Sequence, residues 1–155
     1  MSFFKPANRA ESADRLAGLT GLGTGLAGLI YVAGAAQPLV DAETAALLDM
    51  AQLIGGLAIL IGFLPLFFFF KTRFGGQPVN PWKTDGFMSA VVRRAGFTAF
   101  AAGMLAMIVL TMLDNLILER ITAEILLDAI IAFALLVFSA SFFLFSRGGA
   151  DEAEA

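Results

Sequence analysis

Hydrophobic positions gather in four long runs, at residues 16–36, 50–70, 95–113 and 125–145. The first three contain no charged residue, and the fourth contains only Asp128, close to its start. A bilayer core takes about 20 mainly apolar residues of helix, and backbone groups in lipid must be hydrogen-bonded internally. The runs are long and do not alternate with a period of two. This pattern predicts four transmembrane α-helices rather than barrel strands.

The composition agrees with this prediction and narrows the chemistry. Of 155 residues, 59% are hydrophobic and 15% are charged, whereas a soluble domain has about 25% charged residues. The mean hydropathy is +0.84, and a small globule could not bury so much apolar surface. The absence of Cys and His excludes thiol nucleophiles, disulfides, Cys/His zinc sites and imidazole acid–base catalysis. We therefore predict an integral membrane protein that is not an enzyme and has no cofactor, metal site or nucleic acid partner.

The charged residues divide the ends of the four runs into two sides. Nine of the ten basic residues precede the first run, lie between the second and third, or follow the fourth. The opposite side has one basic residue, Arg120, and seven acidic residues: Asp41, Glu43, Asp49, Asp114, Glu119, Glu124 and Asp128. Because Lys and Arg concentrate in cytoplasmic segments, we predict that both termini and the central loop are cytoplasmic.

The two halves of the chain resemble each other at a spacing of 78 residues. The identical pairs include Arg15 and Arg93, Ala17 and Ala95, Gly18 and Gly96, Thr20 and Thr98, Gly25 and Gly103, and Ile30 and Ile108. This spacing predicts two tandem helical hairpins, 1–77 and 78–155, related by an axis along the membrane normal. The predicted fold is all-α, a four-helix bundle with a parallel internal repeat. Chance agreement between apolar helices is the alternative.

Small residues recur at four-residue steps within the runs. Lipid provides no hydrophobic force between helices, so their association depends on close packing of small side chains. The first and third runs have matching rows of small residues, and we predict that they form a central pair with the other two helices toward lipid. The predicted helix-packing residues are Ala17, Gly21, Gly25, Gly28, Gly55, Gly62, Ala99 and Gly103. The alternative for Gly21-x-x-x-Gly25 is a face for self-association.

Two further features of the runs have structural interpretations. Thr20, Thr24 and Thr98 are predicted to hydrogen-bond to the backbone of their own helices. Pro65 lacks a backbone donor, which predicts a kink in the second helix.

Acidic residues lie near the outer ends of the predicted spans. The positive N-terminal end of a helix favours a carboxylate, which accounts for Asp49 and Asp128, and Asp41 is placed to cap the second helix. The alternative is that Asp49, Asp114 and Asp128 form a cation or proton site, because intramembrane acids often mark transport pathways.

The cytoplasmic loop before the third run is basic. Thr84 is a suitable N-cap for a helix that leads into the run. Lys83, Arg93 and Arg94 are predicted to contact lipid headgroups, and a docking surface for a partner or for anionic lipid is the alternative.

The second half combines Asp85-Gly86-Phe87, the pair Arg93-Arg94, and an apolar hairpin with Phe138 that ends at Arg147. In these features it resembles small bacterial inner-membrane proteins often encoded beside helix-turn-helix regulators. The resemblance implies a location in the bacterial inner (plasma) membrane and assigns no functional residue.

Together these features favour a non-enzymatic membrane protein that acts through helix–helix or protein–protein contacts, as an accessory subunit, scaffold or regulator. It would be surrounded by lipid and would form a homo-oligomer or bind a partner membrane protein. The alternative is a small oligomeric transporter or channel that uses the outer carboxylates. A packed core with one exposed groove of small residues would favour the first function, and a polar cavity between the spans would favour the second.

Overall fold

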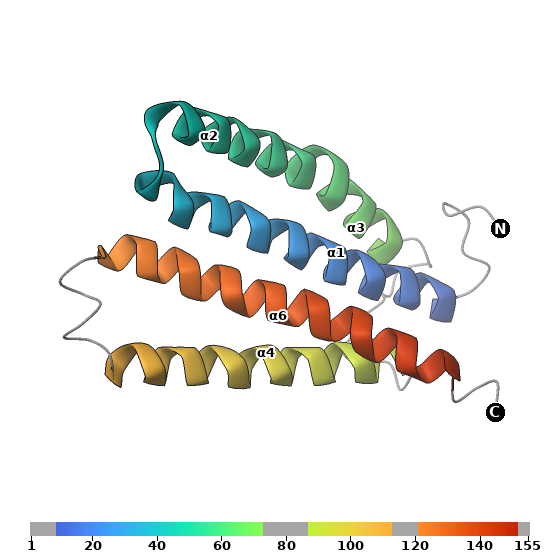
Figure 1. Ribbon diagram of the computed structural model, residues 1–155. Helices are drawn as coiled ribbons and strands as arrows, with labels where there is room; N and C mark the ends of the chain where they lie inside the picture. Colours follow the sequence, from blue (N-terminus) through green and yellow to red (C-terminus); the bar gives the residue numbers. More distant parts are fainter. Residues whose placement is uncertain (1–8, 73–86, 113–120, 152–155) are drawn as a thin grey trace.

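A computed structural model describes residues 9–72, 87–112 and 121–151 of the chain. Regular structure in this part of the chain is entirely helical, which confirms the predicted all-α class (Figure 1). The elements are α1 (Arg9–Ala36), the 3₁₀ turn η1 (Gln37–Leu39), α2 (Ala42–Leu57), the π-helical segment η2 (Ala58–Phe63), α3 (Leu64–Thr72), α4 (Phe87–Met112) and α6 (Ala123–Asp151).

Four helical stretches are long and apolar enough to cross a membrane, as predicted. They are Glu11–Leu39, Ala42–Phe69, Phe87–Met112 and Ala123–Arg147, of 29, 28, 26 and 25 residues. Large apolar side chains also cover the outer surface; Met112 is 82% exposed, Phe97 74% and Ile61 72%. A soluble monomer rarely exposes apolar patches on this scale, whereas a lipid environment accommodates them.

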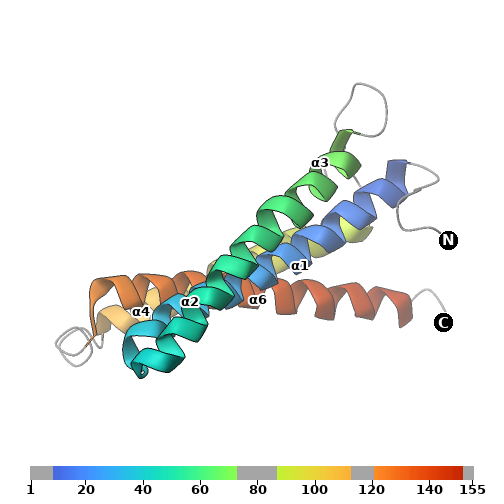
Figure 2. The ribbon, with the colours of Figure 1, turned by 90° about the horizontal axis from the view of Figure 1, so that it is seen from above.

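The four long helices lie side by side in the order α2–α3, α1, α6, α4 (Figure 1). The α1 helix makes its largest interface with α6, α4 packs on the opposite side of α6, and α2 and α3 pack on α1. Viewed from above, α1, α2 and α3 cross α6 obliquely (Figure 2). The two ends of the bundle are distinct: the η1 end holds η1 and the first turns of α2 and α6, and the terminal end holds the start of α1 and the last turns of α6.

The prediction that the first and third apolar runs form the central pair is wrong. These runs correspond to α1 and α4, which touch only slightly, and α6 takes the central place beside α1. The second span does lie outermost, and none of its most apolar window is buried. The error has a physical cause: a row of small residues on one helix can receive large side chains from another, and the sequence does not say which helix supplies them.

This order of helices also bears on the predicted repeat axis. If one axis exchanged the two hairpins, α2 would lie against α4 in the same way that α1 lies against α6. The described parts of α2 and α4 make no contact. The arrangement is therefore not the symmetric bundle that the sequence repeat suggests.

The buried core joins three helices near the terminal end. One cluster consists of Ala17 from α1, Val91, Val92, Ala95 and Ala99 from α4, and Phe138 and Phe142 from α6. On the other side of α1, Leu16 and Leu19 pack against Phe63, Leu66 and Phe67 of η2 and α3. The first half of α1 is thus buried on two faces and holds the two hairpins together.

A wide helical turn precedes Pro65 in the second span. Proline cannot donate a backbone hydrogen bond, and its ring crowds the carbonyl group four residues earlier in an α-helix. The preceding residues form the π-helical segment η2, in which the Leu64 N–H donates to the Ile59 carbonyl. Such a turn interrupts the regular ladder of hydrogen bonds. The structure thus has a π-helical segment at the place where the sequence predicted a kink.

The α2 helix begins at the cap that the sequence predicts. Asp41 has extended backbone angles, and its Oδ1 accepts hydrogen bonds from the N–H groups of Glu43 and Thr44 at 3.1 and 3.0 Å. The Thr44 hydroxyl donates to Oδ2 at 2.9 Å. The hydrogen bonds from Thr44 are the main reason that the Asp41 pKa lies below its ordinary value of 3.8.

This cap predicts a pH-dependent part of the stability. A carboxylate whose pKa is lowered by folding stabilises the folded state above its unfolded pKa, and that contribution disappears as the pH falls through the folded value. The variant Asp41→Asn keeps a good capping residue but does not titrate. Between neutral pH and a pH well below 3.8, we expect the wild-type Tm in detergent to fall further than that of Asp41→Asn. Parallel loss of Tm in both proteins would contradict this assignment.

Candidate functional site

The glycine row of α1 receives side chains from α6. A Cβ atom on Gly21 would lie 2.8 Å from Phe142 Cε1, and one on Gly25 would lie 2.6 Å from Ser139 Oγ. These separations are shorter than van der Waals contact, so only glycine lets the two helices approach this closely. The Gly21-x-x-x-Gly25 face is thus occupied within the chain, which contradicts its alternative interpretation as a free face for self-association.

The other predicted packing residues fall into two groups. Gly28 faces Leu136 of α6, Gly55 lies against Ile30 of α1, and a Cβ on Gly103 would lie 3.7 Å from that of Ala134; Ala17 and Ala99 are buried. Gly62 differs, because nothing lies within 4 Å of the position its Cβ would occupy. The prediction of a packing role for Gly62 is therefore wrong: the residue lies in the π-helical segment and faces open space.

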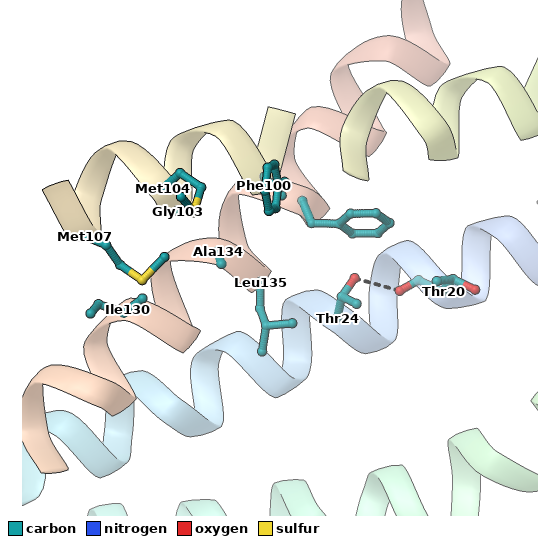
Figure 3. A pocket seen from close by; sticks show the side chains of 11 residues that line it. Thr20, Thr24, Phe100, Gly103, Met104, Met107, Ile130, Ala134 and Leu135 are labelled. Carbon is teal, nitrogen blue, oxygen red and sulfur yellow. Dashed lines mark hydrogen bonds between the residues drawn. The ribbon is translucent and has the colours of Figure 1, made fainter. Parts of the chain in front are cut away.

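An apolar groove runs between α1, α4 and α6, with a volume of about 460 Å³ (Figure 3). We call it the α4–α6 groove. Its lining residues are Thr20 and Thr24 from α1, Ala99, Phe100, Gly103, Met104 and Met107 from α4, and Ile130, Ala134, Leu135 and Phe138 from α6.

The two threonines of the groove have their hydroxyl groups satisfied. Thr20 donates to the Leu16 carbonyl at 2.9 Å, and Thr24 donates to the Thr20 carbonyl at 2.7 Å (Figure 3). Thr98 donates in the same way to Arg94, at 3.0 Å. This confirms the predicted backbone bonding of all three threonines. No charged residue lines the groove, so its chemistry suits an apolar surface and not a polar substrate.

A second cavity, of about 510 Å³, lies at the η1 end between α1, α2 and α6. We call it the η1-end pocket. Its lining residues are Gly34, Gln37, Pro38, Gln52, Thr122, Glu124, Ile125 and Asp128. Asp128 Oδ2 lies 3.1 Å, and Gln52 Nε2 3.9 Å, from the position of a Cβ on Gly34. The Gln52 Nε2 atom is buried and has no hydrogen-bond partner in the part of the chain that the structure describes.

The structure separates the acidic residues that the sequence grouped as a cation or proton site. Asp128 is half-buried in the η1-end pocket, whereas Asp49 is exposed on α2 and does not line it. Asp114 lies outside the described residues. The residues that accompany Asp128 are instead Glu124 and Gln52. The sequence does contain a signal for Gln52, the only amide or charged side chain in the second apolar run.

The predicted basic contact surface is described in part. Arg93 and Arg94 are exposed near the start of α4. Lys83 and the predicted cap Thr84 lie outside the described residues. Among the residues that the structure describes, no group of three acidic side chains is arranged to hold a metal ion.

Comparison of the chain with protein-family models, curated proteins and solved structures finds no match in any of the three. The resemblance of the second half to small bacterial inner-membrane proteins therefore stays a prediction.

Proposed function

We propose that this protein is a non-enzymatic, multi-pass protein of the bacterial inner membrane that binds a transmembrane helix of another membrane protein. It would act as an accessory subunit, scaffold or regulator. The observation that carries the proposal is the α4–α6 groove, because it combines small residues with an apolar lining on an open face of the bundle.

The groove has the properties of a helix-binding surface in lipid. Helices in a bilayer associate through close van der Waals packing at small residues, and the groove offers Ala99, Gly103 and Ala134 at its floor. Met104 and Met107 line the same groove, and methionine adapts its shape to irregular partners. The glycine row of α1 is already filled by α6, whereas this groove is open.

The proposed orientation and repeat rest on the sequence. Basic residues lie before and within the first turns of α1 and before and within the first turns of α4, and acidic residues lie around the start of α2 and α6. With both termini cytoplasmic, the η1 end faces outward. We also propose that the halves 1–77 and 78–155 arose by duplication and that their helices later packed differently.

Site-specific photocross-linking in native membranes tests the proposed function. We expect benzoylphenylalanine at Met107, in the groove, to form an adduct with one polypeptide of defined mass that also co-purifies in mild detergent. The same probe at Leu53, exposed on α2, is expected to react with lipid. Gly103→Leu fills the groove and should reduce the Met107 adduct about tenfold, the change that 1.4 kcal/mol produces.

Gly56→Leu is the matched control, because nothing lies within 4 Å of a Cβ on Gly56. The yield of the Met107 adduct in Gly56→Leu should equal the yield in the protein without this substitution. Lipid adducts alone at Met107, or equal yields for Gly103→Leu and Gly56→Leu, would contradict the proposal. Adducts between two copies of this chain and no other protein would favour a homo-oligomer over an accessory subunit.

The second candidate is the oligomeric transporter or channel, which the η1-end pocket favours because it is polar and contains Asp128 and Glu124. The pocket lies at one end, and the groove and core beyond it are apolar. A pathway would therefore require other copies of the chain. Ion flux into liposomes that Asp128→Asn abolishes would rank this function first.

A further inference from the structure

The η1-end pocket is chemically different from the rest of the helical surface. Three parts of the chain form it: the end of α1 with η1, Gln52 of α2, and Thr122 with the first two turns of α6. Its volume of about 510 Å³ lies within the range of sites that bind small molecules. The pocket shares no lining residue with the α4–α6 groove, so binding there does not rest on the proposed function.

The pocket carries negative charge. Among the described residues, Asp128 and Glu124 line it, and no basic residue does. Asp128 is half-buried and makes no described ion pair, since the ion pair that the structure describes joins Arg15 and Glu11. A carboxylate that is partly removed from water is stabilised by a cation that donates hydrogen bonds. One part of a suitable ligand is therefore an ammonium group.

One hydrogen-bond donor in the pocket has no acceptor among the described residues. Gln52 lines it, and its Nε2, a hydrogen-bond donor, is buried without a partner. Buried polar atoms in folded proteins are nearly always hydrogen-bonded, and an unpaired one is unfavourable. A purely cationic ligand would not supply an acceptor for the Gln52 amide. An anionic oxygen close to the ammonium group of the ligand would accept this hydrogen bond.

Gly34 provides the space between these two groups. The Asp128 carboxylate and the Gln52 amide come from different helices, and both lie within 4 Å of the position that a Cβ on Gly34 would occupy. A side chain there would be 3.1 Å from Asp128 Oδ2, tighter than ordinary van der Waals contact. The glycine thus leaves open the volume that a carboxylate and an amide donor both face.

We propose that the η1-end pocket binds a zwitterion of the phosphoethanolamine type. Its ammonium group bonds to Asp128 and Glu124, and its phosphate oxygen accepts from Gln52. Two sources share this chemistry: the headgroup of an aminolipid, which lies at the level of the ends of membrane-spanning helices, and a free zwitterion in solution.

The test uses the full-length protein in mild detergent. Native mass spectrometry would follow its binding to equal amounts of phosphatidylethanolamine and phosphatidylcholine. The choline headgroup has the same phosphate, but its trimethylated ammonium donates no hydrogen bond. Calorimetry with O-phosphoethanolamine forms the second arm. We expect ethanolamine lipid to be preferred about tenfold, corresponding to about 1.4 kcal/mol.

Asp128→Asn and Gln52→Leu should each remove this preference. Asp49→Asn, an exposed acid on α2 outside the pocket, should retain it. Gly34→Ala keeps every polar group of the pocket and fills its space, so it tests the site if another variant unfolds, as judged by circular dichroism. Saturable binding of O-phosphoethanolamine with the same dependence on these variants would support the proposal with a free zwitterion as the ligand. Equal retention of the two lipids together with no such binding would overturn it, and so would a preference that Asp128→Asn, Gln52→Leu and Gly34→Ala all retain.

Discussion

Phe142→Ala is expected to lower the free energy of unfolding by about 2–3 kcal/mol, because it opens a cavity of roughly 100 Å³ at about 24 cal/mol per Å³. The ring is 1% exposed and belongs to the cluster that joins α1, α4 and α6. It also packs edge-to-face on Phe143, with ring centres 5.3 Å apart. In a bilayer the unfolded helices remain in lipid, so the loss of packing, and not transfer from water, determines the effect.

Reversible unfolding of the purified protein in mixed micelles would measure this change. Phe97→Ala is the control, because this side chain on α4 is 74% exposed and its removal leaves no internal cavity. We expect Phe97→Ala to change the free energy of unfolding by no more than about 0.5 kcal/mol. Equal effects of the two substitutions would mean that Phe142 is not buried between helices in the membrane.

Gly21→Ala is expected to destabilise the protein by about 1–3 kcal/mol through overpacking. The added methyl group would overlap the Phe142 ring, and that ring is fixed within the core. The ring cannot move away freely, so α1 and α6 would have to separate along their largest interface. The same unfolding experiment measures the cost.

Gly18→Ala provides a matched comparison on the same helix. Nothing lies within 4 Å of the position of its Cβ, and alanine has a higher helix propensity than glycine by about 1 kcal/mol. Both variants therefore gain the same helix propensity, but only the methyl group added at position 21 meets a side chain of α6. We expect Gly18→Ala to be neutral or stabilising. A stability change of the same size and sign in both variants would disprove the close contact between Gly21 and α6.

The site was predictable only in part. Asp128 stands out in the sequence as the one charge within an apolar run, and Gln52 as the only amide. Their common position beside Gly34 requires the η1 turn to bring α2 next to the end of α1, and α6 to lie on another face of α1. The sequence grouped Asp128 with Asp49 as a candidate cation or proton site, but Asp49 is exposed outside the pocket. Asp49 lies about one turn before Gln52 on α2, nearer the helix end, and only Gln52 lines the pocket.

The sequence by itself determined the features that depend on local chemistry. The length and apolarity of each run require helices that can cross a bilayer, Asp41 supplies acceptors for the first N–H groups of α2, and Pro65 cannot continue a regular α-helix. Only the tertiary structure decided which helices pair. Gly21 marks a place of close approach, but a flat glycine surface accepts a phenylalanine as readily as another glycine. The partner that fits, Phe142 of α6, depends on how all four helices fill space together. The same packing left the α4–α6 groove open and formed the η1-end pocket.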